Sequence, residues 1–396
     1  MNATAASAPG GVFFSHGFRP FFLAAGVGAP VALLLWLAIL AGTIALPSAF
    51  DIITWHAHEM LFGFVFAAVA GFLLTAVASW TGRPPLRGAP LVGLALLWVA
   101  GRLGVAFSAV IGPGAAALID LALPVALVAI VGREVVASRN WRNLPLTVGV
   151  ATIALANGLF HAEALGWADT AAAGWRLAIA MITVMIGLIG GRIVPNFTRN
   201  WLSKRGETAL PAPFSRVDGA AMAVTLLWAA LWTLWPGHAA TTGAALAAGL
   251  CHAVRLARWR GWRTGAEPLV WVLHLGYLWV PIGLLLVGAA GLTPAIPISA
   301  AIHALTAGAM ATMILAVMTR ATLGHTGRAL TAGPATTALY LMVMAVAPLR
   351  IAAAVAPDLY WPLLHTSGLL WTAAFGIFVA VYGPMLVRPR IDGKAG

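Results

Sequence analysis

Long apolar runs, each broken by proline, glycine or arginine, fill the sequence from near its start to near its end. Twelve runs are long enough for an α-helix to cross a hydrocarbon core of about 30 Å at about 1.5 Å per residue. They lie near residues 21–46, 52–80, 89–111, 115–137, 145–165, 174–195, 216–235, 240–258, 268–290, 297–319, 332–354 and 361–387. Apolar and polar positions do not alternate as they would in the strands of a membrane barrel. The pattern predicts an all-α integral membrane protein with twelve transmembrane helices in one domain (residues 21–387), a cytoplasmic N-terminal segment (1–20) and a cytoplasmic tail (388–396).

Composition excludes a water-soluble globule. Of the 396 residues, 61% are hydrophobic and only 9% are charged, whereas soluble domains carry about 25% charged residues. The single cysteine, Cys251, excludes an intramolecular disulfide.

The lysines and arginines indicate how the chain is oriented. Twenty of the 23 fall in the termini and in alternate connections, and the other three are Arg102, Arg176 and Arg350. Basic residues concentrate on the cytoplasmic side of membrane proteins, so we expect both termini in the cytoplasm. This distribution also explains the net charge of +12 without a nucleic-acid partner.

With this orientation, a group of histidines falls near the outer side of the membrane. The group consists of His56, His58, His161, His238, His303 and His365. Neutral imidazole is a usual ligand of haem iron and copper, so the group suggests metal ligation. The alternative for each histidine is hydrogen-bonded packing.

Two of these histidines are close in sequence but point apart. On a helix His56 and His58 lie about 200° apart, so we expect them to serve different sites rather than one metal. Glu59 shares a face with His56, and an intramembrane carboxylate is a functional candidate. Asp51 is the expected N-cap of this helix.

The sequence also contains an internal repeat. Residues 58–83 and 303–328 both begin with histidine and end in Thr-Gly-Arg, at an offset of 245 positions, and residues 180–201 match them loosely without a histidine. We interpret this as three four-helix units around a pseudo-threefold axis, a plan distantly like that of the haem–copper oxidase catalytic subunit. Chance similarity among alanine-, leucine- and glycine-rich helices is the alternative.

Several motifs together resemble one family. They are GFRPFFLAAG (17–26), WHAHEMLFGF (55–64), GFLLTAVASWTGRPPLRG (71–88), PNFTRNWL (195–202) and HALTAGAMATMILAVMTRATLGHTGR (303–328). These motifs are similar to those of the NnrS family. The resemblance implies a protein of the bacterial inner membrane that contains haem b and copper and is linked to nitric oxide metabolism, nitrosative stress and denitrification.

We interpret the candidate residues on this basis. His58 and His303 are the first candidates for haem iron, followed by His56 and His365. Copper would take His161 and the remaining outer histidines. Glu59 would relay protons or hold a ligand histidine in the required tautomer. Arg102 would pair with Asp120, or else Arg102, Arg176 or Arg350 would bind haem propionates.

Three functions remain open from the sequence. The first is an oxidoreductase that binds and reduces nitric oxide near the periplasmic side, with electrons from a quinol or a small carrier. The second is a non-catalytic haem and copper protein that protects against nitrosative stress or senses nitric oxide. The third is a polytopic transporter. No motif for covalent haem attachment is present, because the only cysteine is followed by histidine.

Overall fold

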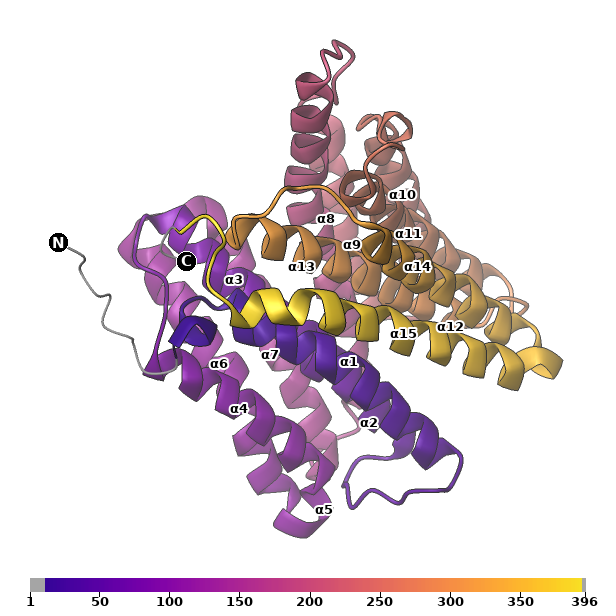
Figure 1. Cartoon of the computed structure of the whole chain (residues 1–396). Coiled ribbons are helices and arrows are strands. Elements are labelled where there is room, and N and C mark those ends of the chain that lie inside the picture. The colour runs from indigo at the N-terminus through magenta and orange to yellow at the C-terminus, as the bar shows by residue number, and fades with distance from the viewer. Residues whose placement is uncertain (1–10, 394–396) are drawn as a thin grey trace. The chain divides into compact units, whose positions relative to one another are not determined.

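The computed structural model describes residues 11–393, and all regular elements in that part of the chain are helical, as expected (Figure 1). The beginning of the expected N-terminal segment and Lys394 of the expected tail lie outside the described residues. The longer helices are α1 (Phe18–Leu40), α2 (Ile52–His58), α3 (Phe66–Thr81), α4 (Ala89–Ala106), α6 (Pro113–Ala137), α7 (Leu144–Ala164), α8 (Ala171–Lys204), α9 (Arg216–Leu234), α10 (Ala239–Ala257), α11 (Pro268–Leu292), α12 (Ile298–His303), α13 (Ala311–His325), α14 (Pro334–Val355) and α15 (Tyr360–Val387).

Three predicted helix ends were wrong. Helix α1 stops at Leu40 rather than near residue 46, because Gly42 has a positive φ of 70° and turns the chain. Helices α8 and α13 continue to Lys204 and His325, past the predicted ends at 195 and 319. Pro195 lies inside α8, and the helix continues through it because a proline removes only one backbone hydrogen bond of a helix.

Eleven helical segments within residues 11–393 are long and apolar enough to cross a membrane. The chain is therefore a multi-pass membrane protein. The expected span that is missing from these eleven, residues 240–258, coincides with α10, a helix of 19 residues. It contains two threonines, His252 and Arg255, and it is not among the eleven. The count of twelve stays a prediction.

The helices form two compact units. The first consists of the N-terminal part through Trp175, Ala321–Ala329 and the C-terminal part from Phe378; the second consists of Arg176–Arg320 and Leu330–Ile377. The expected single domain and the pseudo-threefold arrangement stay predictions.

The two members of the sequence repeat that begin with histidine share an unusual helix. A π-helix of seven residues, Glu59–Val65, begins directly after His58, and another, Ala304–Met310, begins directly after His303. π-Helical turns are rare and are frequent at functional sites. The two π-helices lie at the same offset of 245 positions as the sequence match, which supports the internal repeat.

Asp51 caps α2 as expected. Its side chain accepts hydrogen bonds from the backbone N–H groups of Ile53 and Thr54, at 2.9 and 3.1 Å. Burial raises the pKa of the Asp51 carboxyl, but the hydrogen bonds with Thr54 and Ile53 outweigh this effect and leave the pKa below its ordinary value. The charged form is therefore favoured in the folded state.

Replacing Asp51 with alanine is expected to lower the free energy of unfolding by about 1 kcal/mol at neutral pH. The charge-dependent part of the stabilisation is present above the ordinary pKa of the carboxyl, and it is lost as the pH falls through the lowered pKa. Thermal unfolding in detergent measures both effects. Asp51→Asn is the matched control, since asparagine caps at every pH. Equal stability of the alanine variant and the wild type would contradict the capping role.

Candidate metal centre

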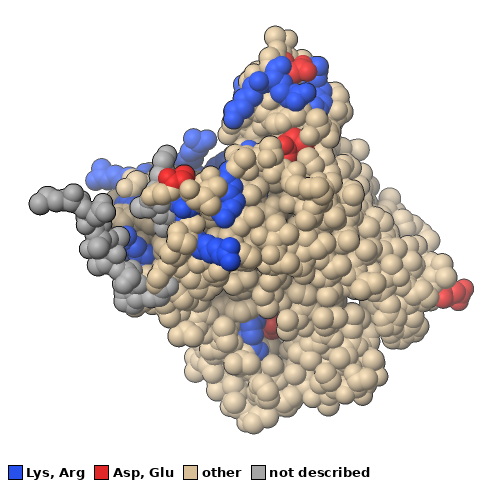
Figure 2. Space-filling model, viewed as in Figure 1, with Lys and Arg blue, Asp and Glu red and all other residues tan. Residues whose placement is uncertain are grey.

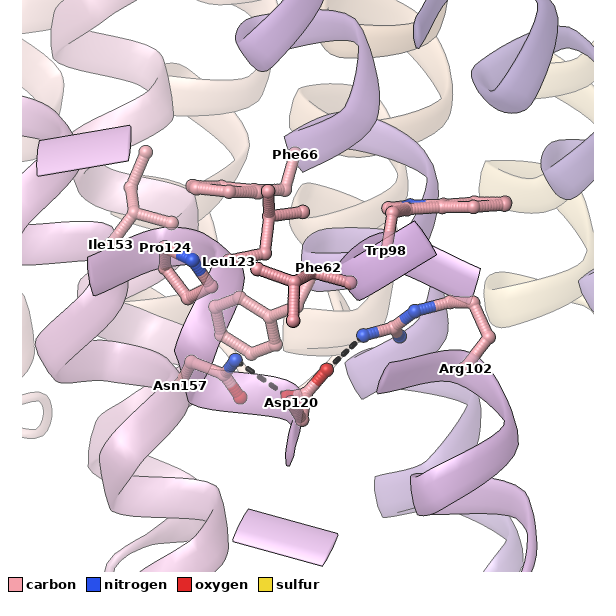
Figure 3. Close-up of a pocket in the computed structure, with 10 residues that line it drawn as sticks. Phe62, Phe66, Trp98, Arg102, Asp120, Leu123, Pro124, Ile153 and Asn157 are labelled. Carbon is pink, nitrogen blue, oxygen red and sulfur yellow. Dashed lines mark hydrogen bonds and ion pairs between the residues drawn. The ribbon is translucent and has the colours of Figure 1, made fainter. Parts of the chain in front are cut away.

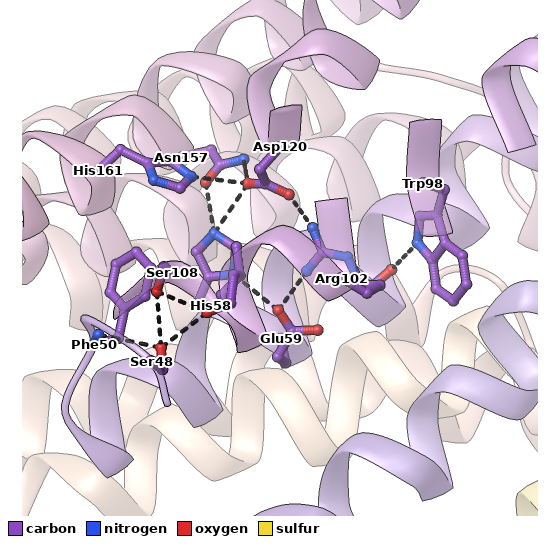
Figure 4. A network of polar contacts seen from close by, with 12 residues as sticks. Ser48, Phe50, His58, Glu59, Trp98, Arg102, Ser108, Asp120, Asn157 and His161 are labelled. Atoms are coloured by element: carbon purple, nitrogen blue, oxygen red, sulfur yellow. Dashed lines mark hydrogen bonds and ion pairs between the residues drawn. The ribbon is translucent and has the colours of Figure 1, made fainter. Parts of the chain in front are cut away.

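Two histidines and an aspartate meet inside the first unit. His58 ends α2, Asp120 lies in α6 and His161 lies in α7, and one ligand atom from each lies within 4.8 Å of the others (Figure 4). All three side chains are buried. Three helices distant in sequence thus place two imidazoles and a carboxylate where one metal ion would contact all three.

His58 has an oxygen atom opposite each ring nitrogen. Its Nδ1 lies 3.2 Å from Glu59 Oε1, and its Nε2 lies 2.8 Å from Asn157 Oδ1 and 3.2 Å from Asp120 Oδ2. A neutral imidazole carries a single N–H, so it can serve only one side as a donor. The oxygen atoms near the other ring nitrogen are then left without a donor from His58, unless a second proton or a metal ion is bound at Nε2.

Arg102 joins the two carboxylates. Its Nη1 donates to Glu59 Oε1 at 2.6 Å, and its Nη2 pairs with Asp120 Oδ1. The expected Arg102–Asp120 ion pair is therefore confirmed. Glu59 Oε1 therefore lies within hydrogen-bonding distance of both Arg102 and His58.

His161 and Asn157 reach the cluster from one face of α7, four residues apart. His161 Nε2 lies 3.0 Å from Asp120 Oδ2, and Asn157 Nδ2 donates to the same oxygen at 2.7 Å. The Nδ1 atom of His161 is buried and has no hydrogen-bond partner among the described residues. Asn157 did not emerge from the sequence reasoning, although an asparagine four positions before a histidine in an apolar helix is a signal.

Glycine and the π-helix allow this close packing. A Cβ atom on Gly101 of α4 would lie 2.7 Å from Asp120 Oδ1, so only glycine lets the carboxylate approach α4. A Cβ atom on Gly63 would lie 3.2 Å from Arg102 Nη1. The indole Nε1 of Trp98 donates to the Gly63 carbonyl at 3.0 Å, which ties α4 to the π-helix.

The network is negatively charged before any cation binds. Two carboxylates, Glu59 and Asp120, face one guanidinium, that of Arg102, and with neutral imidazoles one negative charge is left unbalanced. An unbalanced buried charge is costly. A bound cation of single charge, either a metal ion or a proton on His58, would balance this charge.

A small pocket lies against the cluster. It contains about 260 Å³ of empty space, open space at its mouth included. Arg102, Asp120 and Asn157 form its polar end, and aromatic and aliphatic side chains form the rest (Figure 3). The space open to the centre of a water-sized molecule is about 10 Å³, which is room for about one such molecule.

The other predicted ligands lie elsewhere. His56 stacks on Trp36 of α1, with ring centroids 4.2 Å apart. It contacts a different partner from His58, as the 200° separation predicted. His365, in α15, is exposed and stacks on Trp361, while Arg176 is half-buried in α8.

His303 and Arg350 meet in the second unit. The Nδ1 of His303 donates to the Ser299 carbonyl at 2.7 Å, which leaves Nε2 as the acceptor, and Arg350 Nη2 lies 3.2 Å from it. The Nη1 atom of Arg350 is buried and has no hydrogen-bond partner among residues 11–393. His303 therefore stands in the tautomer that a metal ligand needs.

Two further histidines of the second unit are hydrogen-bonded to neighbouring side chains. His274 Nε2 donates to Thr198 Oγ1 at 2.7 Å. His252 lies between Thr225 Oγ1 and the hydroxyl of Tyr277, at 2.8 and 2.7 Å. Neither belongs to a group that could hold a metal ion within the described part of the chain.

Comparison with known proteins gives one family. Residues 12–390 match the family described as NnrS protein. No curated protein matches the chain.

Proposed function

Because the chain belongs to the NnrS family, we propose that it is a membrane metalloprotein that binds and reduces nitric oxide at an ion held by His58, Asp120 and His161. The buried cluster of these three side chains is the observation that carries the proposal. The membrane is the inner membrane of a bacterium, and both termini face the cytoplasm, on the strength of the arginine distribution.

The donor set favours a redox-active transition metal. Imidazole suits copper, iron and zinc, and two histidines with one carboxylate are a common set for iron. Copper is the metal that the family resemblance implies. A singly charged copper ion would neutralise the one unbalanced charge of the network, and a doubly charged ion would leave it positive.

Each surrounding residue has a defined task. Glu59 accepts the His58 Nδ1–H, so that Nε2 faces the metal position as a ligand. Arg102 holds Glu59 and Asp120 in place and offsets their repulsion. Glu59 is thus a positioning residue rather than a catalytic residue.

The metal would bind nitric oxide and pass electrons to it. In the overall reaction two nitric oxide molecules take up two electrons and two protons and give one nitrous oxide and one water. A quinol or a small electron carrier supplies the electrons.

Haem belongs elsewhere in the chain under this proposal. His58 is assigned to the ion at the cluster, so another histidine would hold the haem iron. His303 would hold the haem iron through Nε2, since its Nδ1–H is bound to Ser299, once Arg350 Nη2, which lies 3.2 Å from Nε2, gives up that contact. Arg350, which has an unused Nη1, would bind a propionate there. His56 and His365 remain weaker candidates.

Gas analysis of reduced protein in lipid vesicles tests the function. We expect the wild type to form one nitrous oxide for every two nitric oxide molecules consumed, and His161→Ala to lose this activity. His238→Asn, a substitution at an exposed helix cap, is the control and is expected to match the wild type.

The outcome separates the alternatives. Metal binding and nitric oxide binding without nitrous oxide would favour a protective or sensing role at the same site. Protein that holds neither metal nor haem would favour a transporter. Equal nitrous oxide formation by His161→Ala and the wild type would contradict the proposed site.

A further inference from the structure

The end of the cluster nearest the membrane surface is closed by an aromatic ring. Phe50 lies in the loop between α1 and α2, outside the candidate membrane spans. Its ring stacks on His58 with centroids 5.3 Å apart and meets His161 edge-on at 5.5 Å. Phe50 is only 8% exposed, so it covers both histidines.

Hydrogen bonds hold this loop in place. Ser108 Oγ accepts the backbone N–H of Ala49 at 2.8 Å, and the N–H of Ala109 donates to the Pro47 carbonyl at 3.0 Å. Ser48 Oγ donates to the Val105 carbonyl at 3.0 Å (Figure 4). The loop is anchored at three positions, which closes the direct route from water to the metal position.

The pocket beside the cluster lies within the candidate membrane spans, whereas Phe50 lies outside them. Its ten lining residues all belong to candidate membrane spans. Leu97 and Trp98 of α4 line it and are half-buried, and the neighbouring Leu96 and Val99 are 62% and 45% exposed. The Arg102 side chain, at the polar end, keeps 16% of its surface exposed. The pocket therefore reaches the outside of the unit within the membrane, among apolar side chains.

The face seen in Figure 2 agrees with this picture. Most of its surface is uncharged, and a small basic and a small acidic area lie side by side within it, among uncharged atoms.

The lining selects for a small uncharged ligand. Phe62, Phe66, Leu123 and Ile153 form an apolar wall, which disfavours ions because a charge loses its hydration there. The polar end offers Arg102 and Asn157 to a weakly polar molecule. A neutral diatomic gas has little hydration to lose, and it dissolves in the bilayer at this depth.

We propose that the neutral gas on which the protein acts reaches the metal position sideways from the bilayer, through the pocket between Leu97, Trp98 and Phe62, and not from water past Phe50. This inference rests on the proposed function of the cluster and adds the route and the selectivity of the site. Trp98 forms the fixed side of the route, since its indole is bonded to the Gly63 carbonyl.

Two variants separate the two routes. Leu97→Trp fills the mouth of the pocket, and Leu96→Trp, one residue away and facing outward, is its matched control. Phe50→Ala opens the closed end. The probes are nitric oxide, as the neutral ligand, and azide, as a small anion. Stopped-flow spectroscopy of reduced and oxidised metal-loaded protein in vesicles follows their binding. Uptake of Co²⁺ by metal-free protein gives a readout that needs no turnover.

We expect Leu97→Trp to slow nitric oxide binding by about tenfold or more, because overfilling a packed passage raises the barrier. Leu96→Trp is expected to bind nitric oxide at the wild-type rate. Phe50→Ala is expected to speed azide binding and Co²⁺ uptake and to leave the nitric oxide rate unchanged.

Two results would overturn the route. One is an unchanged nitric oxide rate in Leu97→Trp, and the other is a faster nitric oxide rate in Phe50→Ala. Failure of the proposed function looks different, because the wild type would then bind neither Co²⁺ at the cluster nor nitric oxide.

Discussion

Replacing Asp120 with alanine is expected to remove the bound metal ion and, with it, the reaction with nitric oxide. The carboxylate is the only charged ligand of the three. Its Oδ2 lies within hydrogen-bonding distance of His58 and His161 and accepts a hydrogen bond from Asn157. Loss of a residue that merely orients a ligand lowers metal affinity by about 10–100-fold, and loss of the ligand itself exceeds this. Metal content after dialysis measures the effect.

The matched control is Asp120→Asn. It keeps the size of the side chain and brings the charges of Glu59 and Arg102 into balance, so the metal-free variant is expected to be at least as stable as the metal-free wild type. Its metal affinity is nevertheless expected to fall, because the negative charge is lost. Full metal content in both variants would place the metal at another site.

Replacing Arg102 with methionine is expected to have the largest effect on stability, about 3–5 kcal/mol. Glu59 and Asp120 would then face each other buried and without their shared cation, with side chains only 6% and 1% exposed. Thermal unfolding of metal-free protein in detergent isolates this effect from metal binding.

Arg133→Met is the matched control for a surface ion pair. The Arg133 side chain is 67% exposed and pairs with Glu134 at 2.7 Å, and exposed pairs contribute about 0–1 kcal/mol. A similar loss of stability in both variants would contradict a special role for the buried pair. An undiminished stability of Arg102→Met would contradict the charge balance described for the network.

Most of the helices could be predicted from the sequence because the length of an apolar run indicates a membrane helix. In lipid every backbone group is bonded within its own helix, so each run of about twenty apolar residues gives one element. The ends were less certain, as at α8, which runs through Pro195 to Lys204. Hydropathy cannot foresee how a helix continues once its neighbours pack against it.

The site was foreseen in part. The sequence indicates His58, Glu59, Arg102, Asp120 and His161 as candidates, and the Arg102–Asp120 pair is one of the two roles that it predicts for Arg102. That His161 shares a cluster with His58 depends on the packing of α7 against α2 and α6, which spacing does not reveal.

Asn157, Phe50 and the two π-helices were missed for different reasons. Asn157 carries its signal only in its spacing from His161, and Phe50 looks like any apolar residue of a loop. The two π-helices have a glycine at the same place in each repeat, Gly63 and Gly308, but a glycine in an apolar run does not by itself predict a π-helix.

Pulsed electron paramagnetic resonance of the Cu²⁺-loaded protein tests the central claim most directly, because it detects the imidazole nitrogens that do not bind the metal. We predict two inequivalent histidines: His58, whose Nδ1–H is bound to Glu59, and His161, whose Nδ1 has no partner in the part of the chain that the structure describes. Glu59→Gln is predicted to shift the signal of the first histidine only, and His161→Ala to remove the second. A spectrum without histidine coupling, or one that these substitutions leave unchanged, would contradict the metal centre at His58, Asp120 and His161.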